Sequence, residues 1–139
     1  DVYFGTLKLR GAEDRSTLKE VNNYANSLGV LERFEEARSL LRRMIPVARR
    51  VLGENNDITL RVKFTYALAL YNDTGATLDD LSEAVATLEE TERTARRVLG
   101  GAHPIVQASE RSLEHARAAL RAREGDVDAL REGVEARGK

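Results

Sequence analysis

The sequence contains no cysteine, no tryptophan and only two prolines in 139 residues. Without cysteine the chain has no disulfide bond, no thiolate metal ligand and no cysteine nucleophile. Aromatic residues make up only 5% of the chain. The longest apolar run, Tyr66 to Tyr71, is far shorter than the roughly 18 residues that a membrane-spanning helix needs. The sequence alone therefore predicts no transmembrane segment.

The chain also lacks an excess of charge of one sign. It has 22 basic and 23 acidic residues, which gives a formal net charge of −1. A general nucleic-acid binder would carry a basic excess, so this balance argues against nucleic acid as a partner. Hydrophobic residues make up 42% and charged residues 32%, a composition typical of one globular domain with a buried core.

No catalytic pattern is visible in the sequence. There is no glycine-rich phosphate loop, no nucleophile elbow and no pair of carboxylates that stands apart from the other acids. The two histidines, His103 and His115, are too few for a metal site, which needs three or four converging ligands. We interpret His103 as a linker residue beside Pro104 and His115 as a surface or groove residue. We therefore predict no enzyme activity, no cofactor and no metal.

What the chain does contain is a repeated helix ending. The segment ARRVLGENNDITL at 48–60 returns as ARRVLGGAHPIVQ at 95–107, and LKLRGAEDRSTL at 7–18 is a third version. The glycine at the centre of each version, at positions 11, 53 and 100, recurs after 42 and then 47 residues. A period of this size with two helical patterns inside it predicts an array of helical hairpins.

We therefore predict a single domain, 1–139, with units of about 11–53, 54–100 and 101–139. In the first unit, apolar spacing predicts a helix capped at Asp14 or Ser16, a turn at 31–33 and a second helix that ends at Gly53. Gly53 would form the left-handed C-cap, and Pro46 would kink the second helix without ending it. The predicted buried positions are Leu18, Val21, Ala25 and Leu28 in the first helix, and Phe34, Ala37, Leu41, Met44, Ala48 and Leu52 in the second.

The second unit follows the same plan with a turn five residues longer. Asp57 is the predicted helix cap, and Thr77 with Asp80 resembles a capping box for the helix that closes at Gly100. The predicted buried positions are Leu60, Phe64, Ala67, Leu68 and Tyr71, then Leu81, Ala84, Val85, Leu88, Ala95 and Leu99.

The third unit is degenerate. Pro104 fits the first turn of a helix that runs through Leu113, Ala116 and Leu120. We predict a turn at Gly125 and Asp126, followed by a short polar helix that serves as the closing cap of the array.

The motif ERFEEA at 32–37 resembles the G-x-Y-E-E-A turn of tetratricopeptide repeats, with Phe34 on the aromatic position and Ala37 on the small one. The sequence RVLG at 97–100, followed by His103 and Pro104, resembles the linker of the 42-residue repeats found in kinesin light chains. The resemblance covers about residues 7–134. It departs from the family where Glu32 replaces the turn glycine, and the later units lack the aromatic.

This resemblance implies an all-α fold, a right-handed solenoid of antiparallel helical hairpins. It also implies a non-enzymatic scaffold or adaptor whose concave groove, lined by the first helix of each hairpin, holds an extended peptide or a helix of a protein partner. Helix geometry supplies the candidate groove residues, which are Lys19, Asn22, Asn23, Asn26, Arg61, Thr65, Arg111 and His115. Lys19, Arg61 and Arg111 could form a basic strip for an acidic peptide or a terminal carboxylate. Ordinary solvated charges, and asparagines that face water or satisfy a helix end, are the competing interpretation.

Two other functions stay open from the sequence. The chain could be an accessory subunit that stabilises a larger assembly through its outer faces or the long turn at 72–80. It could also be the targeting arm of a catalytic domain elsewhere in a longer protein. The sequence starts at Asp1, which we interpret as lying inside a repeat. We therefore leave room for a targeting segment before it and assign the cytoplasm only by default.

Overall fold

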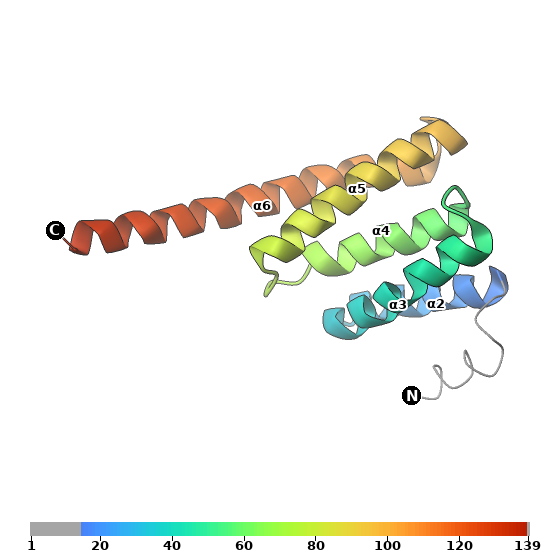
Figure 1. The fold of residues 1–139 in the computed structure, drawn as a ribbon, viewed down its shortest axis with the longest axis horizontal. Helices are drawn as coiled ribbons and strands as arrows, with labels where there is room; N and C mark the ends of the chain where they lie inside the picture. The colour runs from blue at the N-terminus through green and yellow to red at the C-terminus, as the bar shows by residue number, and fades with distance from the viewer. Residues whose placement is uncertain (1–14, 139) are drawn as a thin grey trace.

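The computed structural model describes residues 15–138. These residues form five helices and no strand (Figure 1). The helices are α2 (Arg15–Val30), α3 (Phe34–Leu52), α4 (Asp57–Tyr71), α5 (Leu78–Leu99) and α6 (Pro104–Arg137). Within this range no helix is both long and apolar enough to cross a lipid bilayer.

The helices stack as antiparallel hairpins in two layers. Helix α2 contacts α4, and α4 contacts α6, so these three form one layer. Helix α3 packs against α2 and α4, and α5 packs against α4 and α6, which places α3 and α5 in the second layer (Figure 1). The predicted all-α helical-repeat fold is confirmed.

The first hairpin matches its sequence pattern closely. All four predicted inner residues of α2 are buried, and so are Ala37, Leu41, Met44 and Ala48 of α3. Pro46 lies inside α3, which nevertheless continues to Leu52. Apolar residues spaced three and four positions apart identify the buried face of a helix that meets the core on one side only.

Helix α4 departs from its predicted stripe because it is the central element. It touches α2, α3, α5 and α6, so its buried residues surround most of the helix. Leu60 and Ala67 are fully buried as predicted, whereas Phe64, Leu68 and Tyr71 are only half-buried. A single stripe cannot describe a helix that is covered on several sides.

The two clear copies of the helix ending are built in the same way. Gly53 has φ 90° and ψ 160°, and Gly100 has φ 89° and ψ 152°. Each glycine N–H donates to the carbonyl of the residue four positions earlier. The predicted helix ends are therefore confirmed, but the high ψ makes the chain leave in an extended direction instead of the left-handed helical cap expected. Few residues other than glycine adopt this combination of angles. The third copy, at 7–18, lies almost wholly outside the described residues.

Three residues after each glycine, a side chain caps the next helix. Asn56 Oδ1 accepts a hydrogen bond from the Ile58 N–H at 2.9 Å, and His103 Nδ1 accepts one from the Ile105 N–H at 3.2 Å. The prediction of Asp57 as the cap is wrong by one residue, because the amide of Asn56 occupies that position.

The other predicted caps have mixed outcomes. The capping box of Thr77 and Asp80 is confirmed in both directions, at 3.1 and 3.0 Å. Asp14 lies outside the described residues, and Ser16 lies inside α2 instead of at its cap.

The predicted turn at Gly125 and Asp126 is wrong. Helix α6 runs without interruption from Pro104 to Arg137, so the last segment continues α6 and is not a separate closing helix (Figure 1). One glycine in an exposed helix interior costs only about 1 kcal/mol, and the residues before it, 121–124, are all good helix formers. No described helix packs across this segment to fold it back. The division of the chain into three units stays a prediction.

Candidate functional site

Three neighbouring hollows lie over α4 on the side of α2 and α6. The first, of about 110 Å³, lies between the beginnings of α2 and α4. The second, of about 240 Å³, lies between α2, α4 and the start of α6. The third, of about 190 Å³, lies towards the ends of α2 and α4. Asn22 and Arg61 line both the first and the second, and Asn26 and Thr65 line both the second and the third. The shared walls join the hollows into one surface, which we call the α4 groove.

The structure brings six of the eight predicted residues to this groove. These six are Lys19, Asn22, Asn23, Asn26, Arg61 and Thr65. Arg111 and His115 are exposed on α6 and line none of the three hollows. The predicted basic strip is therefore only partly assembled, because Lys19 and Arg61 share the first hollow without Arg111.

Two of the groove residues are buried polar side chains. Thr65 is 5% exposed, and its hydroxyl donates to the Arg61 carbonyl at 2.9 Å. Asn22 is 8% exposed, and its Oδ1 has no hydrogen-bond partner among the described residues. A buried polar atom left without a partner costs about 1–3 kcal/mol. Asn22 therefore holds an unpaired but solvent-shielded acceptor, on a residue that lines two of the hollows.

The groove carries more positive than negative charge. Three basic side chains, Arg15, Lys19 and Arg61, line the first hollow together with one acid, Asp57. Arg15 pairs with Asp57 at 3.1 Å, so Lys19 and Arg61 are the cations of this hollow that pair with no carboxylate among residues 15–138.

Sequence reasoning missed the apolar part of the groove. Phe64 and Leu68 were assigned to the core, yet Phe64 lines the second hollow and Leu68 the third. Both are half-buried. Helix α4 has apolar residues on almost every side, so the pattern alone could not say which of them face the groove. The excess of apolar residues over one stripe was the available signal.

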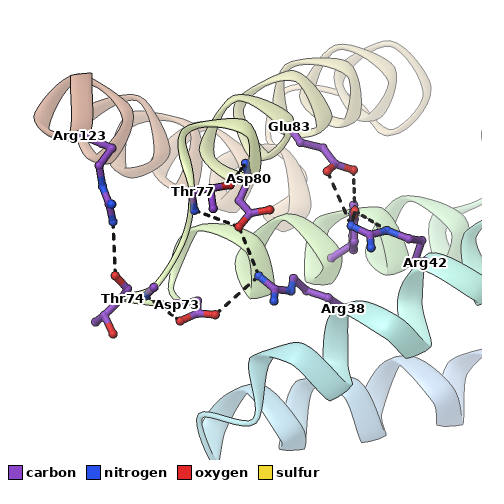
Figure 2. Close-up of polar contacts among 10 residues, drawn as sticks. Arg38, Arg42, Asp73, Thr74, Thr77, Asp80, Glu83 and Arg123 are labelled. Atoms are coloured by element: carbon purple, nitrogen blue, oxygen red, sulfur yellow. Dashed lines mark hydrogen bonds and ion pairs between the residues drawn. The ribbon is translucent and has the colours of Figure 1, made fainter. Parts of the chain in front are cut away.

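The opposite face, between α3 and α5, carries a polar network. Tyr66 of α4 donates to Glu83 of α5 at 2.5 Å and accepts from Arg42 of α3 at 2.8 Å (Figure 2). Burial, together with the hydrogen bond to Glu83, raises the pKa of the Tyr66 phenol above its usual value of 10. One neutral phenol thus connects three helices across two hairpins.

Side chains of α3 and α6 hold the long turn between α4 and α5 in place. Arg38 of α3 lies 3.6 Å from carboxylate oxygens of both Asp73 and Asp80, and the Arg123 guanidinium lies 3.5 Å from the Thr74 carbonyl (Figure 2). The polar groups of this turn are therefore largely used inside the molecule.

Comparison with known proteins adds one match. A family model described as a tetratricopeptide repeat matches residues 21–57, which cover most of α2, all of α3 and the first residue of α4. Residues 21–57 are thus similar to a tetratricopeptide repeat, in agreement with the helical-repeat fold. No curated protein and no solved structure was found to be similar to it. The finer resemblance to the 42-residue repeats of kinesin light chains stays a prediction.

Tetratricopeptide repeats are in general protein-interaction modules. The matched segment ends at the first residue of α4, so the α4 groove depends on the repeat and on the helix that follows it. The match thus indicates the class of function, and the kind of partner has to be inferred from the groove itself.

Proposed function

We propose that the chain is a non-enzymatic interaction module that holds an extended, acidic segment of a partner protein in the α4 groove. The observation that carries the proposal is the unpartnered Oδ1 of Asn22, a residue that lines two of the hollows. An extended peptide presents backbone N–H groups along its length. A rotation of the Asn22 side chain towards either hollow would let one of these N–H groups donate the hydrogen bond that Oδ1 lacks, whatever the side chains of the peptide.

The size of the hollows favours an extended peptide over a small molecule. Taken one by one they measure about 110, 240 and 190 Å³, whereas a small-molecule pocket usually encloses roughly 300–1,000 Å³ in a single cavity. Shallow hollows in a row suit successive side chains of one strand. Phe64 would contact an apolar side chain of that strand, and Lys19 and Arg61 would bind an acidic one.

The competing proposal, docking through the long turn at 72–80, is less well supported. Asp73 and Asp80 are already bound by Arg38. A partner that used these carboxylates would first have to break contacts that hold the turn to α3.

The proposal is tested with an array of short peptides that vary in acidic content, followed by affinity measurements on the strongest binder. Arg61→Ala should weaken an acidic peptide by about tenfold, and Asn22→Ala should weaken acidic and neutral binders alike. Arg93→Ala, which removes an exposed arginine of α5 that lines none of the groove hollows, is the matched control and should bind as the parent does.

Stability gives a second readout for Asn22. Because the replaced oxygen has no partner, Asn22→Ala should leave the free energy of unfolding unchanged or raise it. Peptide binding that survives both groove substitutions, or weakens equally in Arg93→Ala, would contradict the proposal.

A further inference from the structure

The free end of α6 carries an apolar seam that nothing in the described chain covers. The seam follows steps of three and four along α6, at Leu113, Ala116, Leu120, Arg123, Val127, Leu130 and Val134. Its first members pack into the core, and Ala116 is the last buried residue of α6. Beyond it Leu130 is 72% exposed and Val134 is 67% exposed. An average step of 3.5 is the pattern of helices that pair with another helix.

We propose that this free end pairs with the same segment of a second copy of the chain, with the two helices antiparallel. The seam then runs from Leu120 to Arg137 in each copy. Val127 of one copy lies beside Leu130 of the other, and the reverse contact is equivalent by twofold symmetry. This proposal is independent of the α4 groove, because it uses residues that line none of its hollows.

The fold decides the direction of the pairing. The early part of the seam is already occupied by α5, which packs along α6 and is tied to it by the 2.8 Å pair of Arg117 with Glu89 (Figure 1). A parallel, in-register partner would place its own α6 where α5 lies. An antiparallel partner avoids this clash, since its body lies beyond the free end of α6. Its helix then continues the layer that α5 begins.

Charge complementarity identifies the occupant as a second copy. Glu124 and Arg131 lie seven residues apart, so they flank the seam on the same side of α6. When Val127 faces Leu130 of the second copy, Glu124 of each copy comes within reach of Arg131 of the other. The pairing therefore creates two opposite-charge contacts and no like-charge contact between these residues.

Two charged residues fall on the paired seam: Arg137 lies at its end, and Arg123, in its interior, is already turned aside. Arg123 is half-buried, and its guanidinium points to the Thr74 carbonyl of the long turn (Figure 2). Its aliphatic stem is left on the seam, where Val134 of the second copy would cover it.

Sedimentation equilibrium of the full 139-residue chain over a range of concentrations is the direct test. We expect the apparent mass to rise from 15.5 kDa towards twice that value. Leu130→Glu should weaken dimerisation about tenfold or more, because it places a charge in the seam. Ala129→Glu adds the same charge to an exposed position outside the seam and should dimerise like the parent. Mass that stays monomeric at every concentration, or equal behaviour of the two variants, would overturn the proposal.

Charge reversal and cross-linking test the direction. Glu124→Arg and Arg131→Glu should each weaken the dimer a few-fold, and the double variant should recover it, because each contact again joins opposite charges. Since the chain has no native cysteine, a mixture of Val127→Cys and Leu130→Cys chains should form mixed disulfide dimers faster than either variant alone. Faster linking of Val127→Cys with itself would mean a parallel pair and would overturn the arrangement, as would a double charge variant weaker than both single variants.

Discussion

The ammonium of Lys63 on α4 lies 2.5 Å from a carboxylate oxygen of Glu90 on α5 and 3.8 Å from one of Glu54. The Lys63 side chain is only 3% exposed, whereas that of Glu90 is 52% exposed. The aliphatic stem of the lysine is therefore packed between helices, while its ammonium reaches the carboxylates of Glu90 and Glu54 at the surface. The pair links two successive helices on the face opposite the α4 groove.

Removal of Glu90 should cost more stability than removal of the charge on Lys63. Glu90→Ala leaves a buried cation with a weaker partner, and we expect a loss of about 1–2 kcal/mol, below the value for a fully buried pair because Glu90 is half in solvent. Lys63→Met keeps the packing and removes the charge, so it should cost less. Urea unfolding of both variants and of the double variant measures the cycle. An equal loss in the two single variants would show that packing alone matters here.

Acid should weaken the fold partly through Glu90. The hydrogen bond from Lys63 lowers the pKa of the Glu90 carboxyl from its ordinary value of 4.5. The unfolded chain therefore takes up this proton at a higher pH than the folded chain does. The stabilisation from Glu90 is complete above about pH 4.5, the ordinary pKa of the carboxyl. It is lost as the pH falls through the lowered pKa of the folded state.

Urea midpoints of the parent and of Glu90→Gln between about pH 6 and pH 3 test this point. The glutamine does not titrate, so the variant should start less stable at the upper end and lose less stability on acidification. Parallel curves for the two proteins would rule out a lowered pKa at Glu90.

The backbone at Glu32 predicts a stabilising substitution. Glu32 has φ 60° in the turn between α2 and α3, the one positive φ outside glycine among the described residues. A residue with a side chain pays about 1–2 kcal/mol to adopt this conformation. Glycine avoids that cost, but it loses more backbone entropy on folding, which offsets part of the gain. Glu32→Gly should therefore raise the free energy of unfolding by up to about 1 kcal/mol.

Gly53→Ala should have the effect opposite to that of Glu32→Gly. An added Cβ would meet nothing within 4 Å, but φ is +90°, so the backbone alone should make this variant less stable by at least about 1 kcal/mol. Thermal unfolding of the two variants should move in opposite directions from the parent. A shift in the same direction would mean that the turn geometry differs from the one described.

Gly125 distinguishes a continuous α6 from the hairpin that the sequence alone predicts. In the continuous helix nothing lies within 4 Å of an added Cβ, so Gly125→Ala should strengthen the helix by about 1 kcal/mol. Hydrogen exchange of amides 120–134 should slow in the variant. Faster exchange, or a loss of overall stability, would indicate that glycine is needed there for a turn.

Local signals predicted the parts of the fold that local chemistry controls. Gly53 and Gly100 marked both helix ends because few other residues adopt their backbone angles, and Thr77 with Asp80 marked a cap that both residues form. The sequence could not separate Asn56 from Asp57, because either side chain can cap a helix. It also misplaced the turn at Gly125, where the same two residues fit a turn or a helix and only tertiary contacts decide.

The sequence predicted the α2 side of the groove but not all of its α4 and α6 residues. Spacing along α2 placed Lys19, Asn22 and Asn26 beside the buried stripe, where the structure has them. Phe64 could not be assigned, because α4 is covered on several sides. Arg111 was expected beside Lys19 and Arg61 by alignment of the units, but α6 is a single long helix, and the hollows end near its first turns.

Backbone chemical shifts measured while the strongest acidic peptide from the array is titrated into the 15N-labelled chain test the proposed interaction most directly. Amides of Asn22, Asn26, Arg61, Phe64 and Thr65 should shift together and saturate at one affinity, while those of Arg42, Glu83 and Glu90 on the opposite face should stay in place. Shifts confined to the opposite face, or none at any peptide concentration, would contradict a partner held in the α4 groove.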